Sequence, residues 1–302
     1  MELGMIGLGR MGANMSERLV NGGHNVIGFA RHSESVDRIV KKGVKGAYSL
    51  TELVNKLAAP RIIWLMIPAG EPVDNTLKLL LPLLETGDII VDGGNSNYKD
   101  SLRRSVMLRE KGIHYVDVGT SGGVWGLTEG YSMMVGGEKA VVERLSPLFK
   151  TLAPSPSKGW DYVGPNGAGH LVKMIHNGIE YGIMEAYAEG FAILNQKKEF
   201  DLDLHKIAEI WRYGSVIRSW ILDLITKALA NDPKLHDVKP YVEDSGEGRW
   251  TVFEAIDQNL STPVITLSLL QRLSSRDKER FSDRLLAVMR EQFGGHKVKR
   301  GK

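Results

Sequence analysis

Residues 3–12 of the chain read LGMIGLGRMG, and this stretch decides the fold. The residues Leu3–Ile6 form a short apolar strand pattern, and glycines follow it at once at positions 7, 9 and 12. A strand that ends in Gly-x-Gly-x-x-Gly and opens a helix is the dinucleotide-binding fingerprint, in which the helix N-terminus faces a pyrophosphate. The glycine pattern alone is weak, but its strand–turn–helix context makes it specific. We therefore expect a dinucleotide cofactor to be held by Gly7, Gly9, Met11 and Gly12.

The end of the second strand pattern, Asn25–Phe29, bears on which dinucleotide is bound. NAD sites usually carry an acidic residue there for the ribose 2′-hydroxyl, whereas this chain has Ala30 followed by Arg31. An arginine pairs well with a 2′-phosphate through charge-assisted hydrogen bonds. The sequence thus favours NADP, with NAD possible, since Arg31 can also be a surface residue or stack on adenine.

Strand and helix patterns alternate through the first half of the chain. This alternation predicts a doubly wound parallel sheet. After the turn-rich segment 153–159 the pattern is helical almost to the end, with one helix expected over 168–196 and another over 264–293. We predict an α/β fold, with an N-terminal Rossmann-type domain at residues 1–165 and an all-helical C-terminal domain at residues 166–302.

The composition excludes several kinds of site. The chain has no cysteine, so a Cys nucleophile, a thiolate metal site and a disulfide are excluded, and the reducing cytoplasm is the natural setting. A formal net charge of +3 gives no case for nucleic acid, although it suits an acidic small substrate. No apolar run is long enough to span a bilayer, and a strand pattern from the first residue predicts no signal peptide.

A second informative stretch, GAGHLVKMIHNGIEY, covers residues 167–181. Read as a helix, it places Lys173, His176, Asn177 and Glu180 at i, i+3, i+4 and i+7, so a possible base, two hydrogen-bonding groups and a carboxyl share one face. Taken singly, Lys173 fits a lysine snorkelling from a helix edge and Glu180 fits a solvated carboxylate. Burying the whole stripe is costly without a task, so we interpret it as the catalytic face of an oxidising enzyme.

Several separate motifs make the chain resemble 6-phosphogluconate dehydrogenase, decarboxylating, over nearly its whole length. The matching motifs are the glycine fingerprint followed by Asn14, DGGNS at 92–96, GTSGG at 119–123, the helix stretch 167–181, Arg272 within QRLSS, and the spacing of Arg290 and His296. The chain is shorter than the long-form enzymes, which indicates the short-form subfamily. A lysine that long forms place within the segment 244–250 has no clear match here.

The resemblance implies the reaction and the roles of the helix residues. The expected reaction is oxidation of 6-phosphogluconate at C3, loss of CO2 and tautomerisation to ribulose 5-phosphate, a step of the pentose phosphate pathway and of gluconate utilization. Lys173 would take the C3 hydroxyl proton, and Glu180 would protonate the enediol. His176 and Asn177 would hydrogen-bond the substrate. The 3-keto group is the electron sink, so no metal is required.

The resemblance also implies contacts outside the catalytic stripe. Asn95 follows a strand and would lie where the cofactor meets the substrate. The substrate carboxylate would be bound by Ser121, Gly122 and Gly123. The phosphate would be held by Tyr181, Arg272, Arg290 and His296. In the family the C-terminal tail reaches the site of the partner subunit, which implies a homodimer or homotetramer.

Two other hypotheses stay open at this point. A β-hydroxyacid dehydrogenase of the hydroxyisobutyrate type would share the fold and a helix lysine. It would carry paired asparagines where this chain has His176 and Asn177, and it would lack DGGNS. A non-catalytic nucleotide sensor would keep the glycine fingerprint and lose the polar stripe, which is present here.

Overall fold

The structure, a computed structural model, describes residues 1–300; the last two residues of the predicted second domain lie outside this range. The chain forms two compact units, unit 1 (Met1–Asn177) and unit 2 (Gly178–Lys302). Unit 1 holds a mostly parallel sheet, and the elements described in unit 2 are helical. The predicted fold class, a Rossmann-type α/β region followed by a helical region, is confirmed.

Within the described residues, the strands of unit 1 form one sheet of eight, in the order β3-β2-β1-β4-β5-β6-β7-β8. Neighbouring strands pair in parallel except β6 with β7, which pair antiparallel. The strands are β1 (Glu2–Ile6), β2 (Asn25–Phe29), β3 (Lys45–Ala47), β4 (Ile62–Leu65), β5 (Ile89–Asp92), β6 (His114–Ser121), β7 (Ser132–Gly137) and β8 (Trp160–Gly164). The sequence patterns did not reveal β3 and β8, because β3 is very short and β8 alternates partly buried with exposed residues.

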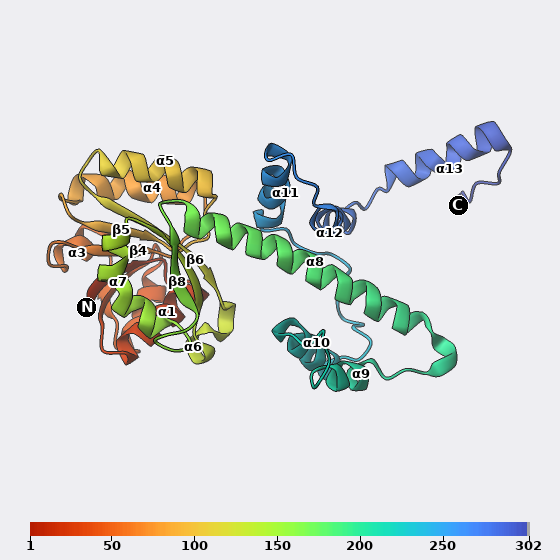
Figure 1. Ribbon diagram of the computed structural model, residues 1–302, viewed down its shortest axis with the longest axis horizontal. Coiled ribbons are helices and arrows are strands. Elements are labelled where there is room, and N and C mark those ends of the chain that lie inside the picture. The colour runs from red at the N-terminus through yellow and green to blue at the C-terminus, as the bar shows by residue number, and fades with distance from the viewer. Residues whose placement is uncertain (301–302) are drawn as a thin grey trace. The chain divides into compact units, whose positions relative to one another are not determined.

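Helices cover both faces of this sheet (Figure 1). One face carries α1 (Arg10–Asn21), α2 (Ser33–Val40) and α7 (Lys139–Leu152), and the other carries α3 (Leu50–Asn55), α4 (Glu71–Leu80) and α5 (Tyr98–Arg109). The short helix α6 (Gly126–Glu129) follows β6. Each face therefore buries its own apolar layer, as expected for a doubly wound sheet.

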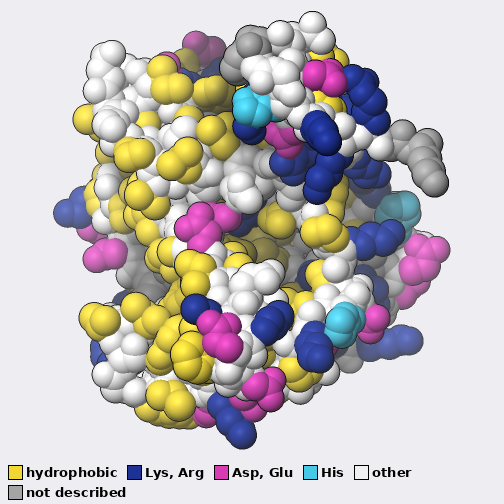
Figure 2. All heavy atoms as spheres, turned by 90° about the vertical axis from the view of Figure 1, so that its right-hand side faces the viewer, with side chains coloured by type: hydrophobic (Ala, Val, Ile, Leu, Met, Phe, Trp, Pro, Cys, Tyr) yellow, Lys and Arg dark blue, Asp and Glu magenta, His cyan; other side chains and the backbone are white. Residues whose placement is uncertain are grey.

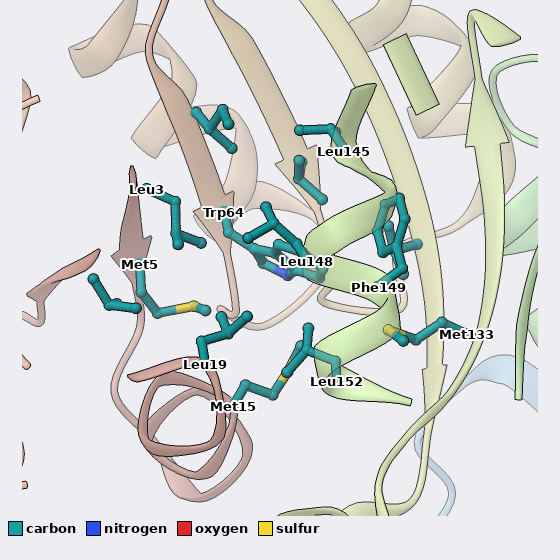
Figure 3. Close-up of a cluster of buried hydrophobic side chains, with 14 of the residues drawn as sticks. Leu3, Met5, Met15, Leu19, Trp64, Met133, Leu145, Leu148, Phe149 and Leu152 are labelled. Carbon is teal, nitrogen blue, oxygen red and sulfur yellow. The ribbon is translucent and has the colours of Figure 1, made fainter. Parts of the chain in front are cut away.

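The core beneath α1 and α7 is shown in Figure 3. The Phe149 ring lies edge-on to Trp64, with ring centroids 5.8 Å apart, and 5.2 Å from the ring of Trp160. Leucine and methionine side chains from β1, α1 and α7 surround this aromatic group: Leu3, Met5, Met15, Leu19, Leu145, Leu148 and Leu152. Full burial of one such side chain contributes about 1.5–3 kcal/mol, so this layer fixes the strands whose ends carry the glycine fingerprint.

The long helix α8 (Ala168–Gln196) begins in unit 1 and continues in unit 2. Its predicted bounds agree with the observed ones. The sequence placed a domain boundary at 165/166, whereas the compact units divide at Asn177 and Gly178. The first turns of α8 belong to unit 1 because they lie directly on the sheet: a Cβ at Gly169 would be 2.4 Å from Asp117 O and 2.5 Å from Met134 O.

Unit 2 continues with α9 (Leu204–Trp211), α10 (Trp220–Asn231), α11 (Glu247–Asp257), α12 (Pro263–Ser274) and α13 (Phe281–Gly294). The single helix expected over 264–293 is wrong. The Asp277 carboxylate accepts hydrogen bonds from the backbone N–H groups of Glu279 and Arg280, and Arg280 has a φ of +48°. This local turn competes with the helix and ends it. None of the helices within residues 1–300 is both long and apolar enough to cross a membrane.

Candidate active site

A cavity of about 710 Å³ opens in unit 1 at the carboxyl ends of β1, β2 and β4. Its walls include Ile6 and Phe29 at the strand ends and Met66 just after β4. The strand order reverses between β1 and β4, and open α/β sheets bind their ligands at such switch points. The volume is in the range of cofactor pockets.

The fingerprint glycines shape one wall of this cavity. Gly7 has a φ of +98°, and a Cβ there would lie 2.3 Å from Met66 O. A Cβ at Gly12 would lie 1.9 Å from Gly7 O, so any side chain at position 12 would clash with the turn that precedes α1. Gly9 has no atom within 4 Å of its Cβ position, which leaves its backbone open to a pyrophosphate. Met11 packs partly buried against the hydrophobic core. The residues present therefore fit a dinucleotide.

Positive side chains line the cavity beyond β2. Arg31 is exposed there, and His32, Ser35 and Arg38 lie on the same wall. Arg38 Nη2 donates to Ser35 Oγ over 3.4 Å. The sequence analysis singled out Arg31 alone. Arg38, a basic residue in the last turn of α2 and three positions after Ser35, was the available signal for the rest.

The start of α8 is held on β6 by backbone contacts. Asp117 is fully buried, and its carboxylate accepts hydrogen bonds from Gly167 N (2.7 Å) and His170 N (2.9 Å). These bonds satisfy N–H groups that the first turn of a helix leaves unpaired. A Cβ at Gly119 would lie 2.3 Å from Lys173 Cβ, so the lysine lies directly over β6.

Three residues of the predicted catalytic stripe meet in unit 1. Lys173 is 5% exposed, and its Nζ lies 3.4 Å from His176 Nδ1. His176 Nδ1 lies 3.0 Å from Asn177 Oδ1. Lys173 is the buried member of the stripe, while His176, Asn177 and Glu180 are partly buried. The spacing seen in the sequence thus produces a continuous polar chain along α8.

Asn95, which was expected near the cofactor and the substrate, also joins two segments of unit 1 through hydrogen bonds. It has a φ of +56° and sits in the loop after β5. Its Oδ1 accepts from Thr120 N (2.8 Å), and its Nδ2 donates to Thr120 O (3.0 Å). Asn95 therefore ties this loop to the end of β6, immediately before the expected carboxylate-binding residues Ser121, Gly122 and Gly123. Of these, Ser121 and Gly122 are partly buried and Gly123 is exposed.

Two of the predicted phosphate-binding residues meet in unit 2. The Arg272 guanidinium lies 3.4 Å from the centroid of the buried Tyr181 ring, and Arg272 Nη1 donates to Glu243 O over 3.0 Å. Glu180 is partly buried on α8. Arg290 and His296 are exposed, and within the described part of the chain no hydrogen bond or ion pair joins them to Tyr181 or Arg272.

Asp244, which the sequence analysis did not single out, anchors the same region of unit 2. Its carboxylate accepts from Arg249 Nη2 (2.7 Å), Gly246 N (3.0 Å) and Tyr181 OH (3.5 Å), and Arg276 Nη2 lies 3.4 Å away. Burial alone would raise the pKa of Asp244, but the hydrogen bonds from Arg249 and Gly246 N hold it below its usual value. The available signal was an acidic and a basic residue five positions apart, with glycines between them.

Comparisons with known proteins agree with these features. One family model, described as the NAD binding domain of 6-phosphogluconate dehydrogenase, matches residues 2–164. Another, described as the 6-phosphogluconate dehydrogenase C-terminal domain, matches residues 169–199 and 186–301. The NAD(+)-dependent, decarboxylating 6-phosphogluconate dehydrogenase of Haloferax volcanii is 43% identical over 99% of both chains. The NADP(+)-dependent, decarboxylating 6-phosphogluconate dehydrogenase of Bacillus subtilis is 37% identical. The match covers 92% of this chain and 62% of that enzyme.

Solved structures show the same relationship. Plasmodium falciparum 6-phosphogluconate dehydrogenase has a TM-score of 0.84 and 29% identity, with all of this chain and 66% of that chain covered. The 3-hydroxyisobutyrate dehydrogenase of Mycobacterium tuberculosis has a TM-score of 0.74 at 21% identity, which is a likeness of fold alone. Relatives of both cofactor preferences occur. The chain is a short-form oxidoreductase of the 6-phosphogluconate dehydrogenase family, with a nicotinamide-nucleotide-binding Rossmann-type region and a helical C-terminal region.

Proposed function

We propose that the chain oxidises 6-phospho-D-gluconate and decarboxylates it to D-ribulose 5-phosphate, with NADP+ or NAD+ as hydride acceptor. The observation that carries this proposal is the buried Lys173, in contact range of His176, in the unit that also holds the dinucleotide fingerprint. The 6-phosphogluconate dehydrogenase of Haloferax volcanii, which this chain matches over 99% of both lengths, supports the same substrate.

Lys173 is the general base of the proposed mechanism. Neutral Lys173 takes the C3 hydroxyl proton while the C3 hydride passes to the nicotinamide, which is the chemistry that the cofactor supplies when bound. The protonated Lys173 then hydrogen-bonds the new 3-keto oxygen, which lies β to the carboxylate. As CO2 leaves, the electron pair of the C1–C2 bond forms the C2–C3 double bond, Lys173 gives its proton to the C3 oxygen, and an enediol remains.

Glu180 is the general acid that completes the reaction. It gives a proton to the enediol carbon that becomes C1 of ribulose 5-phosphate, while neutral Lys173 takes the proton of the enol hydroxyl that becomes the 2-keto group. His176 and Asn177 hydrogen-bond the substrate hydroxyls or the forming carbonyl. Ser121, Gly122 and Gly123 offer a hydroxyl and backbone N–H groups to the substrate carboxylate, and Asn95 holds that segment in place.

The substrate phosphate is assigned to cationic and phenolic groups. Tyr181 and Arg272 are already stacked in unit 2, and an arginine fork suits a dianion. Arg290 and His296 complete the set from α13 and the segment after it. Because both are exposed in this chain, they are available to the site of a partner subunit.

The cofactor preference is assigned to NADP, with NAD as the alternative. Arg31 supports NADP, because it lies on the cavity wall where a 2′-phosphate would approach and no acidic residue stands in its place. The NAD+-dependent relative supports the alternative.

We assign the chain to the cytoplasm, where it would form a homodimer or homotetramer. The surface of unit 2 supports the oligomer. Large apolar side chains there are exposed, among them Val216 at 99%, and Figure 2 shows such side chains gathered on one face of the molecule. Monomeric proteins rarely leave large contiguous apolar areas in water, so a second copy is the proposed cover.

Replacement of Lys173 tests the proposed function. In Lys173→Ala, turnover of 6-phosphogluconate should fall by about 10²–10⁴-fold while the cofactor Kd is unchanged. Lys206→Ala on α9, an exposed lysine, is the control and should keep full activity. A wild-type chain that binds cofactor without turnover would support the sensor, and turnover of 3-hydroxyisobutyrate instead would support the β-hydroxyacid dehydrogenase.

A further inference from the structure

A chain of buried polar side chains lies in unit 1 beside the residues assigned above. It starts at Arg104 on α5 and Asp92 at the end of β5, which are both fully buried, with Nη1 and Oδ2 3.4 Å apart. Arg104 also donates to Asp74 Oδ1 (2.8 Å), Gly70 O (2.9 Å) and Ser96 Oγ (3.1 Å). A buried ion pair is weak evidence for stability, because a well-packed apolar replacement is often as stable. Stability therefore does not explain why Arg104 and Asp92 are buried together.

Asp92 connects the pair to Tyr115 on β6. Tyr115 OH donates to Asp92 Oδ2 over 2.9 Å, and Ser96 Oγ donates to the same oxygen over 2.8 Å. Burial, together with the charges of Asp92 and Asp117, holds the pKa of Tyr115 well above that of free tyrosine. The Tyr115 hydroxyl thus stays protonated, and its oxygen is left to accept.

Ser101 connects Tyr115 to the start of α8. Ser101 lies beside Tyr115, where its hydroxyl lowers the pKa of Tyr115 against the larger effect of burial. Its Oγ lies 2.7 Å from His170 Nδ1. Ser101 Oγ donates its single proton to Asn97 O over 3.3 Å. We therefore assign the Ser101–His170 hydrogen bond to an Nδ1–H donor on His170. His170 is 1% exposed, and its Nε2 has no hydrogen-bond partner within the described residues.

His170 is the point at which this chain of hydrogen bonds reaches the catalytic helix. Its backbone N–H is bound by Asp117, and its side chain is bound by Ser101. Lys173 follows three residues later, one helical turn along the same face. Two independent contacts on one residue fix both the position and the rotation of this first turn, and with it the direction of Lys173.

We infer that Asp92, Tyr115, Ser101 and His170 form a buried hydrogen-bond relay that positions Lys173 for proton abstraction. They are positioning residues, which act through the first turn of α8, and the inference rests on the proposed role of Lys173 as base. The expected loss of kcat on breaking the relay follows from geometry, since a displacement of about 1 Å at a reacting group can reduce a rate by about 100-fold.

Ser101→Ala and Tyr115→Phe test the relay, because each removes one hydroxyl with little change in volume. We expect kcat to fall by about 10–100-fold, with KM for 6-phosphogluconate and the cofactor Kd within about twofold of wild type. The deuterium isotope effect on kcat with C3-deuterated substrate should rise, because hydride transfer becomes slower than product release. Ser105→Ala is the matched control on α5, since among residues 1–300 its Oγ bonds inside that helix, to Leu102 O.

The role of the imidazole is tested by a pair of variants at His170. His170→Asn keeps an N–H near the Nδ1 position and should retain most of the activity, whereas His170→Leu should behave as Ser101→Ala does. Unchanged kcat in Ser101→Ala and Tyr115→Phe, with only a lower Tm, would overturn the relay and leave a structural network. Lys173→Ala is run in the same assay: if it retains turnover, the proposed base is wrong, and if it alone is inactive, only the relay fails.

Discussion

The two units of the chain bury their apolar side chains to very different degrees. Unit 1 encloses a continuous apolar layer on each face of its sheet. Within the described residues of unit 2, the buried clusters are small, around Val252 and Leu269 in one and Leu222 and Leu229 in the other. Many large apolar side chains of unit 2 are exposed instead, as on the face shown in Figure 2.

This difference in burial indicates which unit holds each part of the proposed active site in place. The Lys173 end of the catalytic helix lies in unit 1 and is held by buried contacts within a single chain. Tyr181 and Arg272 lie in unit 2, whose packing within one chain is less complete. We therefore expect the position of the base Lys173 to be set by the fold of unit 1, and substrate phosphate binding to depend on what covers unit 2.

The largest expected contrast comes from one substitution made in each unit. Phe149→Ala removes a fully buried ring that packs against Trp64 and Trp160, and should lower the free energy of unfolding by about 3–5 kcal/mol. Phe253→Ala removes a ring that is 55% exposed and should cost less than about 1 kcal/mol in a dilute, dissociated chain. Urea titration measures both. If both variants lost the same free energy of unfolding at every protein concentration, the proposed difference in packing between the two units would be wrong.

A second contrast uses glycine at two ends of one helix. Gly169→Ala puts a Cβ 2.4 Å from Asp117 O and 2.5 Å from Met134 O, so it should cost about 1–3 kcal/mol and lower kcat. Gly190→Ala meets no atom within 4 Å and should stabilise α8 by about 0.5–1 kcal/mol. Thermal unfolding and initial rates report both effects. A tolerated alanine at position 169 would show that α8 is not seated on the sheet as described.

A substitution in unit 1 should weaken cofactor binding alone, and a substitution in unit 2 should weaken substrate binding alone. Arg31→Ala in unit 1 should lower kcat/KM for NADP+ roughly tenfold through loss of charge-assisted bonds, with KM for 6-phosphogluconate unchanged. Arg272→Ala in unit 2 should raise KM for 6-phosphogluconate by a similar factor and leave the cofactor unaffected. Arg109→Ala, an exposed arginine of α5, is the control. If Arg31→Ala leaves the NADP+/NAD+ ratio unchanged, Arg31 does not select the cofactor.

The smallest effect concerns the acid stability of unit 2. The lowered pKa of Asp244 means that its folded form holds a proton less readily than the unfolded chain does, where an aspartate titrates near about 3.9. Its contribution is thus fully present above that pH and is lost as the pH falls through the lower folded value. Asp244→Asn should be less stable by about 1 kcal/mol at pH 7 and show a flatter acid limb in unfolding experiments. An unaltered acid limb would exclude this role.

The sequence predicted unit 1 and α8 well, because periodicity and the glycine fingerprint are local signals. It also predicted the meeting of Lys173, His176 and Asn177, since helical spacing alone places them on one face. The break between α12 and α13 was missed, because the side chain of Asp277 decides it through bonds to the next backbone N–H groups. A strand as short as β3, which has only three residues, carries too little pattern to be recognised.

The supports of the site could not be predicted in the same way. Ser101 and His170 are 69 positions apart in the chain, and Asp117 reaches Gly167 across 50. No periodicity joins such partners; only the packed sheet brings them together. The same holds for Asn95, whose expected contact with ligands was inferred from its place after a strand, while its bonds to Thr120 required the structure.

The most direct test of the account is the initial rate with 6-phosphogluconate, measured in parallel with NADP+ and NAD+, following reduced nicotinamide and released CO2. The account predicts one CO2 for each reduced nicotinamide, with the higher kcat/KM for NADP+. Reduction without CO2 would contradict the proposed use of the catalytic helix in the second half of the reaction. No turnover with either cofactor would contradict the function itself.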